Sequence, residues 1–70
     1  MPTFFFHFMR GDEVVSDDNG TPCEDRQEAL SVAGAAAAEL NGENEYVGGT
    51  LVVFDEGGTE IGRISISPVH

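Results

Sequence analysis

The sequence predicts an α+β domain in two layers, with the order β-β-α-β-β and one helix packed on one face of a mainly antiparallel, four-stranded sheet. Two observations lead to this fold. Two pairs of short segments rich in β-branched and aromatic residues, each joined by a turn that contains glycine, flank one alanine-rich segment with helical spacing. The chain has 70 residues, of which 40% are hydrophobic and 23% charged, so we expect residues 1–70 to form a single small domain.

The first strand is expected at residues 3–9, where aromatic side chains favour a pleated, half-buried strand over a helix. Because side chains alternate along a strand, this segment presents two largely apolar faces. One face carries Phe4, Phe6 and Phe8, and the other carries Phe5, His7 and Met9. A tight reversal at residues 10–12 leads into a short return strand at 13–16. The polar loop 17–20 follows, and we expect Pro22 to block any continuation of the ladder.

The helix is expected to begin at the N-cap Asp25, with Glu28 three residues later in the capping-box position. Asn41 and Gly42 end it after about 15 residues, which is about 23 Å of helix. Gly34 lies inside this helix at a cost of about 1 kcal/mol relative to alanine. We expect close packing of the thin helix on the sheet to explain this glycine. The apolar positions at helical spacing are Ala29, Leu30, Ala33, Ala37 and Leu40.

The second pair of strands is expected at residues 50–54 and 60–67, which are again rich in β-branched residues. Residues 55–59 between them predict a hairpin loop, in which Gly57 and Gly58 occupy the positions that need a positive φ. With the first hairpin and the helix, these strands complete the predicted fold.

Several short motifs are similar to those of a known family. Residues 1–7, Met-Pro-Thr-Phe-Phe-Phe-His, resemble the M-P-x-[YF]-[YF]-F-H start of a large family of short bacterial proteins classed as a domain of unknown function. Its D-x-x-G motif is resembled twice, by Asp17 with Gly20 and by Asp55 with Gly57 or Gly58. Asp25 with Ala29 and Ala33 resembles the acidic start and the alanine-rich body of the family's helix. The resemblance implies a free-standing bacterial cytoplasmic domain and supplies no catalytic residue.

The charge of the chain excludes several classes of function. Thirteen acidic residues against three basic ones give a formal net charge of -10, and there is no lysine. The three cations, Arg10, Arg26 and Arg63, are too few to form the basic stripe that neutralises phosphates, so we expect no direct binding to nucleic acid and none to membranes. We also expect no secretory leader and no transmembrane segment. With one cysteine and thus no internal disulfide, the expected location is the cytoplasm.

Individual residues offer little chemistry. His7 has the side chain best suited to act as a base or ligand, but a histidine on the less buried face of a strand more often packs against aromatics. Cys23 has acidic sequence neighbours and no basic one to lower its pKa, which disfavours thiolate chemistry. A zinc site built from His7, Cys23, His70 and a carboxylate lacks the paired short spacings of zinc ligands. We therefore predict no catalytic residue, no metal site, no cofactor and no small-molecule substrate.

The loop at residues 17–20 superficially resembles a calcium-binding loop. Aligning Gly20 with the glycine of an EF-hand places Val15 at the first ligand position and Arg26 at the closing glutamate, which excludes an EF-hand. Weak divalent-cation binding by the carboxylates remains an alternative to a solvated turn.

The sheet face away from the helix is the more informative feature. One helix covers one face of four strands, so apolar side chains are left over on the other, and large exposed apolar patches usually mark interfaces. We predict an interface at Phe5, His7, Met9 and Arg63. The alternative is that long side chains, Arg63 among them, cover this face within one chain.

These observations predict a small acidic interaction or regulatory module, non-catalytic, which associates with itself or with a protein partner. The first alternative is an acidic nucleic-acid mimic that binds a basic nucleic-acid-binding protein through complementary charge. A small enzyme that uses His7 with a carboxylate and a weak divalent-cation binder are further alternatives. Adaptation to a saline habitat would explain the acidity without any partner.

Overall fold

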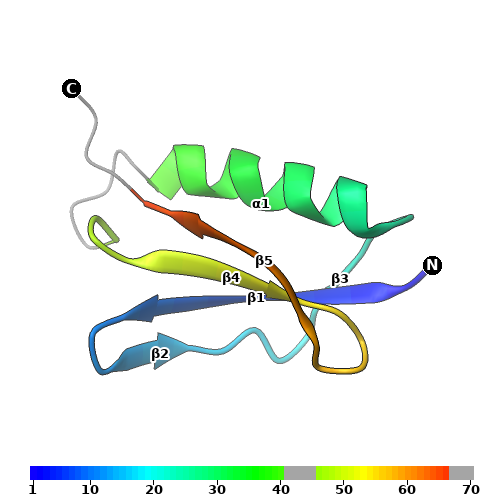
Figure 1. Ribbon diagram of the computed structural model, residues 1–70, viewed down its shortest axis with the longest axis horizontal. Helices are drawn as coiled ribbons and strands as arrows, with labels where there is room; N and C mark the ends of the chain where they lie inside the picture. The colour runs from blue at the N-terminus through cyan, green and yellow to red at the C-terminus, as the bar shows by residue number, and fades with distance from the viewer. Residues whose placement is uncertain (41–45, 67–70) are drawn as a thin grey trace.

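The computed structural model describes residues 1–40 and 46–66 and confirms the α+β class, with one helix on one face of an antiparallel sheet (Figure 1). The strands pair in the order β2-β1-β4-β5, and β3 also pairs with β1. The elements are β1 (Thr3–Arg10), β2 (Glu13–Val15), β3 (Thr21–Pro22), α1 (Arg26–Leu40), β4 (Thr50–Phe54) and β5 (Glu60–Ser65). Four strands in this order correspond to the predicted sheet, and β3 is an addition to it.

The additional strand β3 lies on the same edge of β1 as β2. Val15 of β2 pairs with Phe8, whereas Thr21 and Pro22 pair with Phe4 and Thr3 near the beginning of β1. The expectation that Pro22 would block the ladder is therefore wrong. An edge strand needs backbone hydrogen bonds on one side only, so a proline whose missing N–H would face outward is tolerated there.

The helix has the predicted length and the predicted N-cap. It spans 15 residues, and Asp25 Oδ1 accepts a hydrogen bond of 2.8 Å from the backbone N–H of Glu28. The Glu28 side chain reaches back to the backbone N–H of Glu24 at 3.1 Å, one residue beyond the donor that a standard capping box uses. The predicted stop at Asn41 and Gly42 lies outside the described residues.

The fully buried side chains of α1 are all small, and Leu30 and Leu40 pack against the core while only partly buried. Ala29, Ala33 and Ala37 are between 0% and 3% exposed, so the large apolar side chains of the core come from the sheet. The sheet and its flanking segments contribute Phe4, Phe8, Cys23, Leu51, Val53 and Ile66 to this core. Because Phe4 and Phe8 are buried in it, the helix covers the face of β1 that carries the even-numbered residues.

The helix packs closely on the sheet at Gly62 of β5. A Cβ added to Gly62 would lie 2.6 Å from Leu30 Cδ2, closer than side chains pack in proteins. Gly34 has no such role, because a Cβ at that position meets no neighbouring atom within 4 Å. The expectation that close packing explains Gly34 is wrong, since the glycine that allows this contact lies in the sheet.

The second hairpin contains a β-bulge in β5. Val53 pairs with Gly62 and Phe54 pairs with Glu60, so Ile61 is one extra residue between two paired positions. The bulge allows Glu60 and Arg63, three residues apart, to lie on the same face of the sheet. The prediction of a positive φ is confirmed for Gly58, whose φ is 85°, and is wrong for Gly57, because the loop needs the left-handed conformation at one glycine only. Strand β5 ends at Ser65, short of the predicted end at residue 67, which lies outside the described residues.

Replacing Gly34 with alanine is expected to raise the free energy of unfolding by about 1 kcal/mol, because the helix gains propensity and the methyl group meets nothing. For a domain of this size the melting temperature should rise by about 4–8 °C. The measurement is urea or thermal unfolding followed by circular dichroism.

Gly49→Ala is the matched control for this variant. Its Cβ would collide with the ring of Phe8 and lie 3.1 Å from the carbonyl oxygen of Met9, so we expect a loss of about 1–3 kcal/mol. A Gly34→Ala protein less stable than the wild type would contradict the assignment of Gly34 to open space.

Candidate interaction surface

The sheet face opposite α1, which we call the open face, is covered by no other element of the described chain. Its position follows from the strand register, in which His7 of β1 pairs with Val52 of β4, and Val52 pairs with Arg63 of β5. The open face includes Phe5, His7, Met9, Val14, Thr50, Val52, Phe54, Glu60, Arg63 and Ser65. The four residues predicted to form an interface, Phe5, His7, Met9 and Arg63, therefore share one face.

The centre of the open face is more enclosed than its edges. Val52 is only 1% exposed, because its cross-strand neighbours His7 and Arg63 flank it on both sides. Phe5, His7 and Met9 are half-buried, whereas Val14 on the edge strand β2 is 57% exposed. Long side chains thus cover part of this face within one chain, and an apolar margin stays accessible to solvent.

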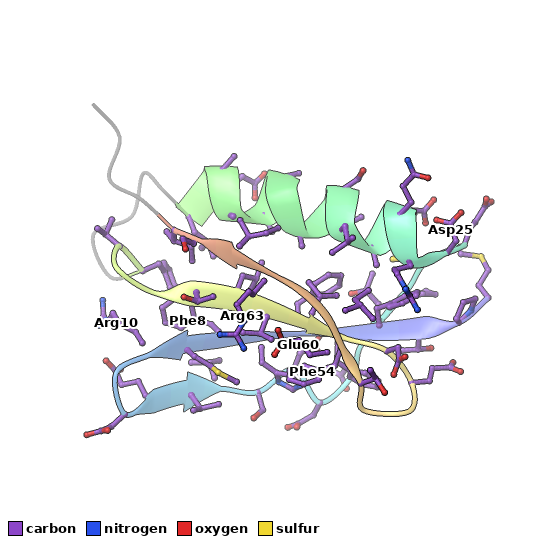
Figure 2. All side chains as sticks on the ribbon, viewed as in Figure 1. Phe8, Arg10, Asp25, Phe54, Glu60 and Arg63 are labelled. Carbon is purple, nitrogen blue, oxygen red and sulfur yellow. The ribbon has the colours of Figure 1, made fainter. Side chains whose placement is uncertain are left out.

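One ion pair supplies the charges of the open face. Arg63 donates from Nε to Glu60 Oε2 at 2.9 Å and from Nη2 to Glu60 Oε1 at 2.7 Å, a bidentate arrangement beside Phe54 (Figure 2). The hydrogen bonds from Arg63 lower the pKa of Glu60 and raise that of Arg63. The two charges cancel, so this face is electrically neutral in a chain whose net charge is -10.

At the edge of the open face, the loop between β2 and β3 is attached to β1 by Asp17. Asp17 Oδ2 accepts a hydrogen bond of 3.2 Å from the backbone N–H of Phe6, at the point where neither β2 nor β3 pairs with β1. Asp17 Oδ1 accepts a second hydrogen bond of 3.0 Å from Gly20 N–H. The carboxylate thus replaces a missing strand partner and closes the loop. This role of Asp17 is not evident from the sequence, although the D-x-x-G motif contains both residues of the hydrogen bond to Gly20.

The same loop uses His7. The backbone N–H of Asp17 donates to Nδ1 of His7 at 3.1 Å, so this nitrogen is an acceptor and carries no proton. The imidazole also packs edge-on against Phe54, with 5.0 Å between the ring centroids. Both contacts are structural, and they correspond to the alternative in which His7 packs against aromatics. The enzyme alternative would have to use Nε2 of this ring.

Cys23 is enclosed in the core at 1% exposed. Burial, followed by the negative charges of Glu28 and Asp25, raises the pKa of its thiol above the ordinary value of 9.0. The thiol is therefore protonated at neutral pH and shielded from reagents.

The described residues contain no group of three metal-ligating side chains and no pocket. His70, one member of the zinc site considered from the sequence, lies outside the described residues. Two aspartates of the acidic loops, Asp17 and Asp55, use their carboxylates for contacts with the backbone. Asp55 Oδ1 accepts hydrogen bonds from Gly57 N–H at 3.0 Å and from Thr59 N–H at 2.9 Å, much as Asp17 does in its own loop. These two carboxylates close turns of their own loops.

The family model of a domain of unknown function, DUF6894, matches residues 3–67. The chain belongs to the DUF6894 family. The resemblance to a family of short domains of unknown function is thereby confirmed, and in this DUF6894 domain both D-x-x-G motifs form turns closed by aspartate. No curated protein and no solved structure matches the chain. Within the residues described, no helix is long and apolar enough to cross a membrane.

Replacing His7 with phenylalanine should lower the free energy of unfolding by about 1 kcal/mol. The new ring can still pack against Phe54, whereas the backbone N–H of Asp17 loses its acceptor. Urea unfolding measures the stability, and amide hydrogen exchange at Asp17 reports on the lost bond directly. Unchanged exchange at Asp17 would contradict the hydrogen bond to Nδ1.

Stability is expected to fall as the pH rises above about 9. The unfolded thiol of Cys23 ionises near its ordinary pKa of 9.0, while the folded thiol keeps its proton because its pKa is raised. The folded state then binds more protons than the unfolded state, so rising pH favours unfolding until the folded pKa is passed. Unfolding free energies measured across alkaline pH should decline less steeply in Cys23→Ala, and equal slopes for the two proteins would refute this linkage.

Proposed function

We propose that this DUF6894 domain is a small acidic interaction module, without catalytic activity, that associates with a second copy of itself through the open face. The observation that carries the proposal is the contrast between this face and the rest of the chain. The open face is largely apolar, has one ion pair that cancels, and is covered by no other element within the described residues. The proposal includes a bacterial cytoplasmic location and no cofactor.

A dimer of standard size would need most of the open face. The molecule measures 35 × 24 × 17 Å along its principal axes, and its broadest side includes α1 as well as the sheet, so the open face is smaller than that side (Figure 1). A stable interface of standard size buries about 800 Å² on each partner. Most of the open face would therefore take part, in an arrangement of two sheets packed face to face about 10 Å apart. Such a dimer is two-fold symmetric, because each copy contributes the same surface.

Electrostatics favour the open face as the place where two copies meet. Two chains of charge -10 repel each other, and this repulsion is smallest where a neutral surface faces another neutral surface. Salt screens the charges outside the interface, so association should become stronger as the ionic strength rises. A basic partner would show the opposite dependence on salt, which separates the two kinds of partner experimentally.

The sheet edges are less suitable for association than the open face. One edge is formed by β2 and β3, which have three and two residues and include Pro22. The other edge, β5, contains the bulge at Ile61 and the Glu60–Arg63 ion pair. Short strands, proline, bulges and charges all oppose the addition of another strand. Association by strand addition is therefore disfavoured.

An acidic nucleic-acid mimic is the second candidate function. Glu24, Asp25 and Glu28 lie within one turn at the start of α1, together with the cation Arg26. Glu56 lies at the same end of the molecule. Its Oε1 accepts a hydrogen bond from the backbone N–H of Thr3, and Thr3 pairs with Pro22 of β3, the strand that precedes the helix. Capture of a basic DNA-binding protein that weakens with salt would support this function, and capture that is indifferent to salt would count against it.

Val14→Asp is expected to weaken self-association strongly and to change stability little. Val14 pairs with Met9 on the open face and is 57% exposed, so the substitution places a charge in the proposed interface without disturbing the core. The measurement is analytical ultracentrifugation of wild-type and variant protein over a range of concentrations and salt.

Val15→Asp is the matched control, because Val15 is 59% exposed on the same strand but its side chain points to the opposite face of the sheet. It adds the same charge, so it should reduce association much less than Val14→Asp. A wild-type protein that stays monomeric at its highest soluble concentration in high salt would overturn the self-association proposal.

A further inference from the structure

The loop between β2 and β3 contains an Asn19–Gly20 peptide that is open to a spontaneous chemical modification. Asparagine followed by glycine is the sequence in which the next backbone nitrogen attacks the side-chain amide with the least steric hindrance, because glycine has no Cβ. Asn19 is exposed to solvent, which supplies the water for the second step. We propose that Asn19 is a deamidation site and that the carboxylate of Asp17 holds the reaction back in the folded protein.

The reaction is balanced without any oxidant or reductant. The backbone nitrogen of Gly20 forms a bond to Asn19 Cγ, and the bond from Cγ to Nδ2 breaks. Nδ2 leaves as ammonia and takes with it the proton that Gly20 N loses. Water then opens the resulting succinimide at one of its two carbonyl carbons, which produces aspartate or isoaspartate at position 19.

The folded loop restrains the attacking nitrogen. Gly20 N–H is donated to Asp17 Oδ1 at 3.0 Å, and the residue has a φ of 75°. Asp17 is held in turn by the backbone N–H of Phe6 and by Nδ1 of His7. Ring closure removes the Gly20 proton and requires the nitrogen to approach Asn19 Cγ, so it costs the hydrogen bond to Asp17.

Packing around Gly20 adds a second restraint. A Cβ at Gly20 would collide with Thr3 Cγ2 and would lie 2.9 Å from Phe5 Cε1, so the backbone here is pressed against β1. The following residue, Thr21, is paired with Phe4 in the sheet. Rotation of the peptide between Asn19 and Gly20 is therefore opposed from both sides.

The modification would have structural consequences. Isoaspartate adds one carbon to the backbone between residues 19 and 20, which displaces Gly20 from Asp17 and shifts the register of β3 against β1. It also adds a negative charge to an acidic loop. Because Gly20 packs on Phe5, the displacement would reach the open face. The inference about Asn19 itself stands independently of the proposed self-association.

The test compares deamidation rates in full-length protein incubated at neutral pH. Peptide mapping by mass spectrometry measures conversion at Asn19 and separates it from Asn41, and an isoaspartyl methyltransferase assay identifies the isoaspartate. We expect Asp17→Ala to deamidate at least about tenfold faster than the wild type, since a hydrogen bond to a charged group is lost. Asp18→Ala is the matched control, because the Asp18 side chain is exposed and contributes no hydrogen bond to the described loop, and its rate should equal that of the wild type.

Two further measurements complete the test, one on unfolded protein and one on a second variant. Wild-type protein unfolded in urea should deamidate at least as fast as Asp17→Ala. If Asp17→Ala does not show the circular dichroism of the folded state, Asp17→Asn replaces it, and this variant should still deamidate faster than the wild type because the charged acceptor is gone. A folded wild type that reacts as fast as the unfolded chain would overturn the proposal. Asp17 variants that react at the wild-type rate or more slowly would also overturn the proposal. A slower reaction would identify the carboxylate as a base that assists the attack.

Discussion

The packing of the alanine side of α1 against the sheet is the interaction on which the rest of the structure depends. A chain of 70 residues can bury only about 60% of the surface that its unfolded form exposes, so its core depends on how closely the one helix packs on the sheet. Ala29, Ala33 and Ala37 allow the helix axis to lie close to the strands, and Gly62 removes the side chain that would oppose Leu30. The volume of the core is then filled from the sheet side. The second face of the sheet has no helix on it, so only the side chains of the strands and their loops can shield its apolar residues from solvent.

Two different kinds of contact stabilise that second face, one at its centre and one at its edge. In the centre, Val52 is enclosed by its cross-strand neighbours, and Arg63 is neutralised by Glu60. At the edge, the gap between β2 and β3 is bridged by the carboxylate of Asp17, which accepts the backbone N–H of Phe6. A free N–H in a half-buried strand costs free energy, so a charged acceptor at this point stabilises β1 where no strand can. A loop that looks like a solvated turn in the sequence is therefore part of the sheet.

The sequence predicts elements with strong local signals and misses features that depend on contacts between distant residues. The alternation in residues 3–9 and the Asp25 cap are local patterns, and both led to correct strands and a correct helix start. The prediction that close packing explains Gly34 was wrong. Residue spacing cannot show that the glycine in close contact between helix and sheet is Gly62, 28 residues later. The small strand β3 was missed because the weak β-propensity of Thr21–Pro22 is overridden by pairing with β1. Alternation along residues 3–9 was enough to place Phe5, His7 and Met9 on one face. The position of Arg63 depends on the pairing of β4 with β5, and the side that the helix covers depends on tertiary packing, so neither follows from local patterns.

The bulge at Ile61 determines what solvent meets on the open face. If β5 continued in regular register beyond Gly62, Ile61 would stand opposite Phe54 on the open face, and Glu60 would turn toward the helix side. The open face would then carry one more aliphatic side chain, and Arg63 would lack its ion-pair partner there. The carboxylate of Glu60 would lie nearer the core, where an unpaired charge is costly. One inserted residue exchanges these two side chains. The bulge therefore makes the open face less apolar without shortening the strand that completes the core.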